Sequence, residues 1–131
     1  MGQQQLLLII LGVIIVGIAI AVGISMFSSS SVQANKDAIV NDLNNLAADA
    51  YQYRIRPSTM GGGAGSYGGY KVPSKLTSNE NGTYTPTTGV AANSQSFSLV
   101  GTSTSYAGST VTAVLDSTGK LGSFTYAGDF K

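Results

Sequence analysis

A long apolar run near the start of the chain is the feature that most constrains its fold. Residues Leu6 to Ile24 form this run, and no charged side chain occurs before Lys36. A helix over the run is long enough to cross the roughly 30 Å hydrocarbon core of a membrane, and it pairs its own backbone polar groups. The run is too long and too uniform for the surface helix of a soluble domain. We therefore expect an apolar helix that is buried in a membrane or against other chains.

A second periodic stretch follows the four serines at positions 28–31. Its apolar side chains recur at intervals of three, four and seven residues, which places them on one helical face. This pattern predicts an amphipathic helix from about Val32 to Tyr53. Serine does not break a helix, so we expect one helix from Gln5 or Leu6 to about Arg54, with Pro57 ending it. The residues expected to pack this helix on the rest of the chain are Ile39, Leu43, Leu46 and Tyr53.

From Ser58 onward the chain is rich in glycine, serine and threonine, with short apolar alternations. Four segments rich in β-branched and aromatic residues are candidate strands, at positions 83–85, 96–100, 110–115 and 121–126. A turn with a glycine separates the last two segments, which favours an antiparallel hairpin. The apolar residues expected to face a core are Phe97, Leu99, Val111 or Ala113, Leu115, Phe124 and Tyr126.

These elements predict an α+β fold, in which the later half of a long N-terminal helix packs on a small antiparallel sheet. We expect the apolar half of the helix to protrude from that fold. The expected organisation is an apolar helix over residues 1–31, an amphipathic helix over residues 32–56, and a Gly/Ser/Thr-rich β head over residues 57–131.

Composition argues against several classes of function. The chain contains no histidine, cysteine or tryptophan, so the usual ligands of zinc, copper, haem and iron–sulfur clusters and the commonest general base are missing. The formal net charge is +1, and 10% of the residues are charged, which provides no basic face for nucleic acid. We therefore expect no enzyme activity, no cofactor, no metal site, no small-molecule substrate and no nucleic-acid partner bound by an evident motif.

Several short motifs are better explained by local structure than by a binding site. Gly63 to Gly68 matches G-x-G-x-x-G, but a helix precedes it where the dinucleotide fingerprint requires a strand, so a surface loop is expected. Two turns resemble fragments of calcium loops without the further oxygen ligands. Asn81-Gly82-Thr83 is an N-glycosylation sequon on an expected turn, and it leaves glycosylation of Asn81 open beside a plain turn. The aromatic residues are expected to pack in the core or at its rim, not to conduct charge.

The succession of an apolar helix, an amphipathic helix, a loop and an antiparallel sheet resembles type IV pilins and the related pseudopilins of type II secretion. If Met1 is the mature first residue, Leu6, Leu7 and Ile10 fall where that family places its apolar run. The family has an acidic fifth residue that is thought to pair with a neighbour's N-terminal amine, whereas this chain has the neutral Gln5. The family often has a proline near position 22. Here Gly17 and Gly23 are the substitutes at which the helix is expected to loosen.

The resemblance implies a structural subunit of an extracellular, pilus-like helical filament. Its partners would be many identical chains, a membrane before assembly, and a pilus assembly machinery. The subunit would reside in the inner or cytoplasmic membrane and then in a filament on the cell surface. The residues expected in the filament core or its assembly contacts are Met1, Gln5, Leu6, Leu7, Ile10, Ile14, Gly17, Ile18 and Gly23. The alternative is a pseudopilin, or a single-span membrane-anchored envelope protein with a binding head.

Overall fold

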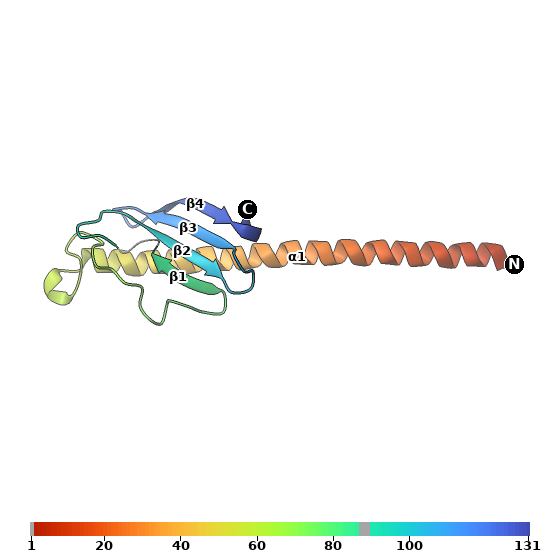
Figure 1. The fold of residues 1–131 in the computed structure, drawn as a ribbon, viewed down its shortest axis with the longest axis horizontal. Helices are drawn as coiled ribbons and strands as arrows, with labels where there is room; N and C mark the ends of the chain where they lie inside the picture. The colour runs from red at the N-terminus through yellow and green to blue at the C-terminus, as the bar shows by residue number, and fades with distance from the viewer. Residues whose placement is uncertain (1, 87–89) are drawn as a thin grey trace. The chain divides into compact units, whose positions relative to one another are not determined.

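One long helix and one antiparallel sheet form the fold of the chain, which the computed structural model describes over residues 2–86 and 90–131 (Figure 1). Helix α1 spans Gly2–Ile55. Four strands and two short 3₁₀ helices follow it, and the expected α+β class is confirmed. In chain order these elements are η1 (Ser58–Met60), β1 (Gly82–Pro86), β2 (Phe97–Ser103), β3 (Thr110–Leu115), β4 (Leu121–Ala127) and η2 (Gly128–Phe130).

The chain divides into two compact units, Met1–Gln33 and Ala34–Lys131. We call the second unit the head. The described part of the first unit is entirely helical, and α1 continues unbroken through Gly12, Gly17 and Gly23. The head contains the remainder of α1 together with all four strands.

The glycine-rich loop that follows α1 caps the carbonyl end of the helix. The backbone N–H of Gly63 donates to the carbonyl oxygen of Tyr53 at 2.8 Å, and that of Gly65 donates to the carbonyl oxygen of Arg54 at 2.7 Å. A Cβ atom on Gly63 would collide with the carbonyl oxygen of Ser66, so the loop can close this tightly because that position is glycine. The last carbonyl groups of a helix lack hydrogen-bond donors within the helix, and here backbone N–H groups of the loop supply those donors. Amides of the G-x-G-x-x-G segment therefore satisfy the helix end.

The four strands form an antiparallel meander in the order β1-β2-β3-β4. The turn between β3 and β4 follows the expectation from the sequence, because Gly119 adopts a positive φ of 83°. The side chain of Asp116 accepts hydrogen bonds from the backbone N–H groups of Thr118 and Lys120. These bonds hold the turn closed and hold the pKa of the exposed Asp116 carboxyl below its ordinary value, with the hydrogen bond from the Thr118 side chain as the largest cause.

The core of the head lies between the later half of α1 and the first three strands. Side chains alternate between buried and partly exposed along β2 and β3, as expected for a sheet with one covered face. The helix contributes a stripe of residues at helical spacing on the opposite side of this core. The buried apolar residues of these elements are Ile39, Leu43, Leu46, Ala47, Ala50, Tyr84, Phe97, Leu99, Val111, Ala113 and Leu115.

A glycine in the middle of β2 allows the helix and the sheet to approach closely. A Cβ atom placed on Gly101 would lie 2.5 Å from Cγ2 of Ile39 on α1 and 3.1 Å from the ring of Tyr84 on β1. Both of those side chains are almost completely buried. The contact therefore has no room for even one more methyl group, and Gly101 fixes how the helix lies on the sheet.

The expectation that Phe124 and Tyr126 face the core is wrong. A β-bulge in β4 sets Ser123 and Phe124 opposite the single residue Ala113, and Ser123 adopts a positive φ of 51°. No described residue of β4 is buried, because this edge strand extends beyond the part of the sheet that is covered. Phe124 remains 36% exposed and stacks on the ring of Tyr126, with the ring centroids 6.5 Å apart.

Three aromatic residues outside the predicted strands complete the core. Tyr67 and Tyr70 come from the glycine-rich loop, and Phe130 comes from η2. The ring of Phe97 packs against both tyrosines, with centroid separations of 5.1 Å to Tyr67 and 5.6 Å to Tyr70. Such edge-on and tilted contacts add to the stabilisation that burial alone provides. Side chains from the loop therefore fill part of the core that the four-stranded sheet and the helix do not fill by themselves.

Substituting Gly101 with alanine should destabilise the head by about 1–3 kcal/mol, because the added methyl group displaces Ile39 or Tyr84 from a filled core. Denaturant unfolding of the detergent-solubilised chain, followed by near-ultraviolet circular dichroism of its tyrosines, measures this change. The matched control is Gly122→Ala on β4, where an added Cβ has no neighbour within 4 Å. The control should change the free energy of unfolding by less than about 0.5 kcal/mol. Equal effects of the two substitutions would contradict the role given to Gly101.

Candidate functional site

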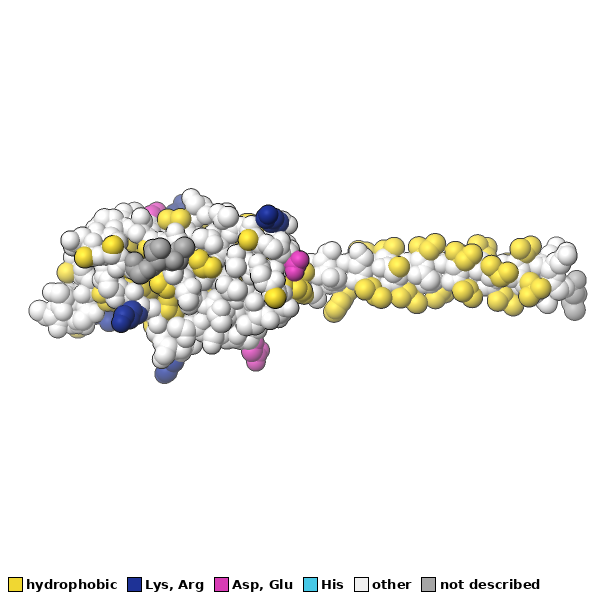
Figure 2. Space-filling model, viewed as in Figure 1, with side chains coloured by type: hydrophobic (Ala, Val, Ile, Leu, Met, Phe, Trp, Pro, Cys, Tyr) yellow, Lys and Arg dark blue, Asp and Glu magenta, His cyan; other side chains and the backbone are white. Residues whose placement is uncertain are grey.

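The first candidate site is the apolar segment of α1, which we define as residues Leu6–Phe27. Every large apolar side chain in this segment is more than half exposed, from 52% at Ile14 to 75% at Phe27. Figure 2 shows these hydrophobic side chains along the helix. They occupy all sides of it instead of one stripe. A helix that is apolar all round requires a lipid or protein environment on every side.

The residues predicted for assembly lie within or beside this segment. Leu6, Leu7, Ile10, Ile14 and Ile18 are exposed apolar side chains of α1. Gln5 is an exposed helical residue just before the segment, and Met1 lies outside the described residues. The five apolar side chains are therefore exposed along one stretch of α1.

Glycines leave shallow depressions in the surface of the apolar segment. A Cβ atom added at Gly12, Gly17 or Gly23 would meet no atom within 4 Å. Gly12 and Gly17 line a shallow, open apolar groove together with Ile9, Val13, Val16 and Ile20. A neighbouring helix could approach the backbone more closely at these positions than elsewhere on the segment.

The predicted helix–sheet residues divide into two groups. Ile39, Leu43 and Leu46 are buried, with exposed fractions of 0%, 0% and 1%. Tyr53 is partly exposed, and its ring packs edge-on against Tyr70 with a centroid separation of 5.5 Å. The Tyr53 hydroxyl donates to the carbonyl oxygen of Gly68 at 2.8 Å. Tyr53 therefore holds the glycine-rich loop against the end of the helix.

A carboxylate on α1 anchors the loop before β1. One oxygen of Asp42 accepts hydrogen bonds from the hydroxyl of Tyr84 at 2.5 Å, from the amide of Asn79 at 2.8 Å and from the amide of Asn81 at 3.0 Å. Partial burial acts to raise the pKa of Asp42, but the three hydrogen bonds outweigh it, so the pKa lies below its ordinary value. Burial and the nearby carboxylate raise the pKa of Tyr84. This cluster ties the loop to the helix through charge-assisted hydrogen bonds.

Asn81, the residue of the glycosylation sequon, is part of the same cluster. Its side-chain nitrogen donates to Asp42, and its carbonyl oxygen accepts a hydrogen bond from the side chain of Asn35. A glycan replaces one of the two hydrogens on that side-chain nitrogen, so a glycan and the contact with Asp42 would involve the same atom. Glycosylation of Asn81 stays a prediction.

A second carboxylate on the same face of the helix, two turns further on, borders a small pocket. Asp49 accepts a hydrogen bond from the hydroxyl of Tyr70 at 2.8 Å, and burial together with this contact raises the pKa of Tyr70. The pocket has a volume of about 290 Å³, and the cationic side chains of Arg56 and Lys71 also line it. Within residues 2–86 and 90–131, no group of three or more carboxylates is placed to hold a metal ion.

Sequence reasoning did not identify the Asp42 cluster or the buried tyrosines of the loop. The sequence contained one indication of the Asp42 cluster. Asn79 and Asn81 flank Glu80 in a segment that must turn before a strand. Two closely spaced tyrosines among glycines were a signal for Tyr67 and Tyr70, since an ordered loop tends to bury large aromatic rings. Neither signal specified the partner on α1.

Comparison with known proteins identifies no relative: no family model matches the chain, and neither a curated protein nor a solved structure matches it. In the part of the chain that the structure describes, α1 is the one helix long and apolar enough, by length and composition, to cross a membrane. The function of the chain is therefore inferred from the apolar segment.

Acid should weaken the head through Asp42. Because the folded-state pKa of Asp42 is lowered, its contribution is fully present above the ordinary carboxyl pKa of 3.8 and is lost as the pH falls through the lowered value. Replacing Asp42 with asparagine should remove this acid-dependent part and cost about 1 kcal/mol near neutral pH, because solvent exposure weakens these charge-assisted bonds. Thermal unfolding measured from about pH 2 to about pH 7, a range that brackets the ordinary pKa values of carboxyl groups, tests this expectation.

The control for this experiment is Glu80→Gln, which removes an exposed carboxylate from the same loop. Its acid profile should match that of the unmodified chain. An Asp42→Asn variant that loses stability in acid as steeply as the unmodified chain would contradict the role given to Asp42.

Proposed function

We propose that the chain is the structural subunit of a helical filament, in which the apolar segments of many copies bundle together and the heads cover the outside. The observation that supports this function is the exposure of every large apolar side chain from Leu6 to Phe27, on all sides of the helix. A segment of this kind is stable when other chains or lipid enclose it completely. A bundle of identical helices provides such an enclosure.

The free energy available from this association is large. Burying the large apolar side chains of one subunit is worth on the order of tens of kcal/mol, at about 25 cal/mol per Å² of apolar surface removed from water. In a helical array each subunit binds its neighbours through two different surfaces, so the contact repeats without closing into a ring. The hydrophobic effect would therefore drive growth along one axis.

The extent of the charge-free region favours a filament over a simple anchor. The first charged side chain is Lys36, so the preceding 35 positions are free of charge. As a helix they cover about 52 Å at 1.5 Å per residue. The hydrocarbon core of a membrane is about 30 Å thick, so an anchor does not require so long an uncharged helix. A dry bundle benefits from it along the whole length, because an unpaired charge there would be costly.

The layout of the chain resembles that of type IV pilins, and this resemblance guides the remaining details. Before assembly the apolar segment would hold the subunit in the inner or cytoplasmic membrane. An assembly machinery would then move it into a filament on the cell surface. The neutral Gln5 would offer hydrogen bonds to a neighbouring subunit in place of an ion pair. Gly17 and Gly23 would be the places where helices approach closely or loosen during assembly.

A second candidate is a pseudopilin or a single-span membrane protein whose head binds a partner in the envelope. The observation that favours it is the length and apolar character of α1, which suit a membrane span without any filament. The two candidates differ in what the purified chain does when detergent is removed. A filament subunit forms uniform fibres, whereas an anchor remains as dispersed chains in added lipid vesicles.

Replacing Ile14 with aspartate should abolish filaments, because it places an unpaired charge inside a dry bundle, where an isolated ion costs several kcal/mol. The measurement is assembly of the full chain on removal of detergent, followed by sedimentation and negative-stain electron microscopy. This assay bypasses membrane insertion, which the same substitution would also impair. Circular dichroism in detergent should show that the head of the variant remains folded.

The matched control is Leu76→Asp, which places the same charge on an exposed leucine of the head. This variant should form filaments as the unmodified chain does. Normal filaments from the Ile14→Asp variant would overturn the proposed function, as would an unmodified chain that never forms regular fibres.

A further inference from the structure

The sheet of the head has an outer face that α1 does not cover. Along β1, β2 and β3 every second residue is buried, and the side chains between them point to the other side of the sheet. The strand register extends this side to β4, where Thr125 pairs with Thr112. We define the outer face by these positions, which are Thr83, Thr85, Ser98, Val100, Thr102, Thr110, Thr112, Val114, Gly122, Thr125 and Ala127.

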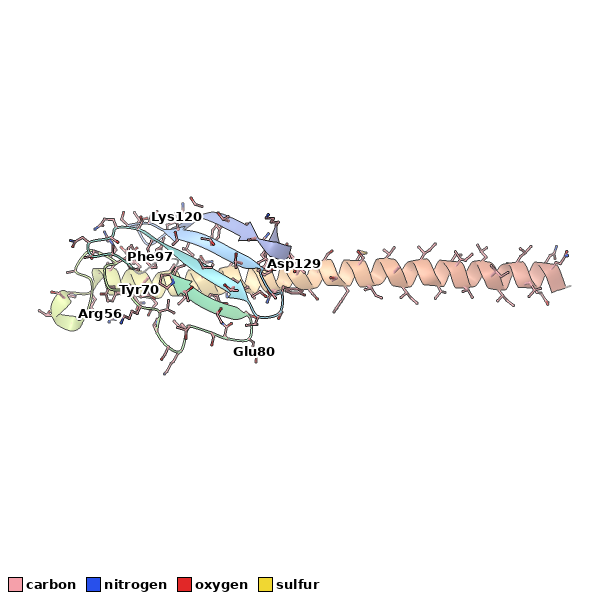
Figure 3. The ribbon with its side chains drawn as sticks, viewed as in Figure 1. Arg56, Tyr70, Glu80, Phe97, Lys120 and Asp129 are labelled. Carbon is pink, nitrogen blue, oxygen red and sulfur yellow. The ribbon has the colours of Figure 1, made fainter. Side chains whose placement is uncertain are left out.

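The outer face carries no charge. Over the bounds that the structure describes, none of the four strands contains a lysine, arginine, aspartate or glutamate. The charged side chains of the head come instead from α1, the loops, the turns and the C-terminal segment. Four of them are labelled in Figure 3 and come from four segments outside the strands, namely Arg56, Glu80, Lys120 and Asp129. The centre of a protein interface is likewise depleted of charge, whereas its rim is polar.

Threonine predominates on the outer face and makes it complementary to itself. A threonine hydroxyl both donates and accepts hydrogen bonds, so a threonine face can bond to an identical one. The branched side chain has few rotamers, and it therefore loses little conformational freedom in a contact. Val100 adds apolar area between Thr85 and Thr112, its register partners on the neighbouring strands. Two such faces can meet without bringing like charges together.

The outer face is too small to hold two free heads together firmly. Strands lie about 4.8 Å apart and rise about 3.3 Å per residue, so four short strands present a face of roughly 15 by 20 Å. A standard interface buries about 800 Å² on each partner, which is well above this area. Weak contacts become firm when many of them act together, as between two filaments that lie side by side. The area therefore favours a contact that is repeated between filaments.

We propose that the outer face joins one filament of this chain to another, with the sheets of opposing heads packed face to face about 10 Å apart. This inference rests on the proposed function and adds a contact between filaments to it. Each head contributes the same surface, so the contact pairs two heads and does not itself extend a filament. Growth of a filament is left to the apolar segments, and the outer face assembles filaments into bundles.

Other partners match the outer face less well. A nucleic acid or an anionic membrane surface would require cationic side chains, which this face lacks. Insertion into lipid would require a mainly apolar surface, whereas threonine predominates here. A charged protein surface would lose hydration against the outer face without gaining an ion pair. A second copy of the same uncharged face avoids each of these costs.

Charge placed at the centre of the outer face tests the proposal with the full chain. Thr112 is partly exposed and lies on β3 between Val100 of β2 and Thr125 of β4. In a face-to-face contact, Thr112→Lys opposes lysine to lysine, and Thr112→Glu opposes glutamate to glutamate. Filaments of each variant, formed separately on removal of detergent, should bundle about tenfold less than filaments of the unmodified chain. Low-speed sedimentation collects bundles, high-speed sedimentation collects single filaments, and electron microscopy distinguishes them.

Mixing the two kinds of filament is the decisive measurement. Preformed Thr112→Lys filaments and Thr112→Glu filaments should bundle with each other to within about twofold of the unmodified filaments, because lysine then meets glutamate. If the outer face bound some other surface of the neighbouring filament, mixing would restore nothing, and the inference would be overturned. The corresponding pair of substitutions at Val100 repeats the test if circular dichroism shows that a Thr112 variant has not folded.

The control pair is Thr59→Lys and Thr59→Glu, which place the same charges on an exposed residue of η1, beyond the sheet in Figure 1. Both should bundle as the unmodified chain does. Loss and recovery in this pair equal to those of the Thr112 pair would reveal general attraction between oppositely charged filaments and overturn the inference. Normal bundling of Thr112→Lys filaments, or unmodified filaments that remain single, would overturn it as well. An unmodified chain that forms no filaments contradicts the proposed function instead.

Discussion

The hydrophobic effect acts on the two halves of α1 with different results, and the rest of the structure depends on this difference. The later half carries its large apolar residues on one stripe, so a single sheet can cover them, and Leu43 and Leu46 are fully enclosed. The apolar segment carries them on all sides, and one small head cannot enclose it. Its burial must come from lipid or from other copies of the chain. The chain therefore combines a head with its own core and an apolar segment that requires lipid or other chains around it.

Specific polar and glycine contacts supplement a small core in the head. One sheet and one helix bury few side chains, and the hydroxyls of Tyr70 and Tyr84 add hydrogen bonds to carboxylates on the helix. Gly101 lets the helix approach β2, and the glycine-rich loop caps the helix end. Tyr70 ties the glycine-rich loop to α1, and Tyr84 and Gly101 bring strands β1 and β2 against the same helix. The long helix therefore helps to order the glycine-rich loop, and the hydroxyl of Tyr67 ties the same loop to the carbonyl oxygen of Asp116 in the turn before β4.

The surface of the head is arranged to limit uncontrolled association. The edge strand β4 contains a bulge at Ser123, which disrupts the regular ladder that another strand could extend. The ammonium group of Lys36 lies over the ring of Tyr126 on that strand. Edge-to-edge pairing along β4 is thus disfavoured. In the proposed filament, the apolar segment would supply the affinity between subunits.

The sequence by itself determined the features that depend on local pattern. The long helix, its amphipathic second half, the four strands and the hairpin turn at Gly119 all follow from periodicity and turn chemistry, which act over a few residues. The apolar segment, which is the main candidate site, was visible for the same reason. The tertiary structure alone decided which side chains meet across the fold. The bulge that exposes Phe124 depends on pairing with β3, and the bonds of Asp42 depend on a loop 37 to 42 residues away in the chain.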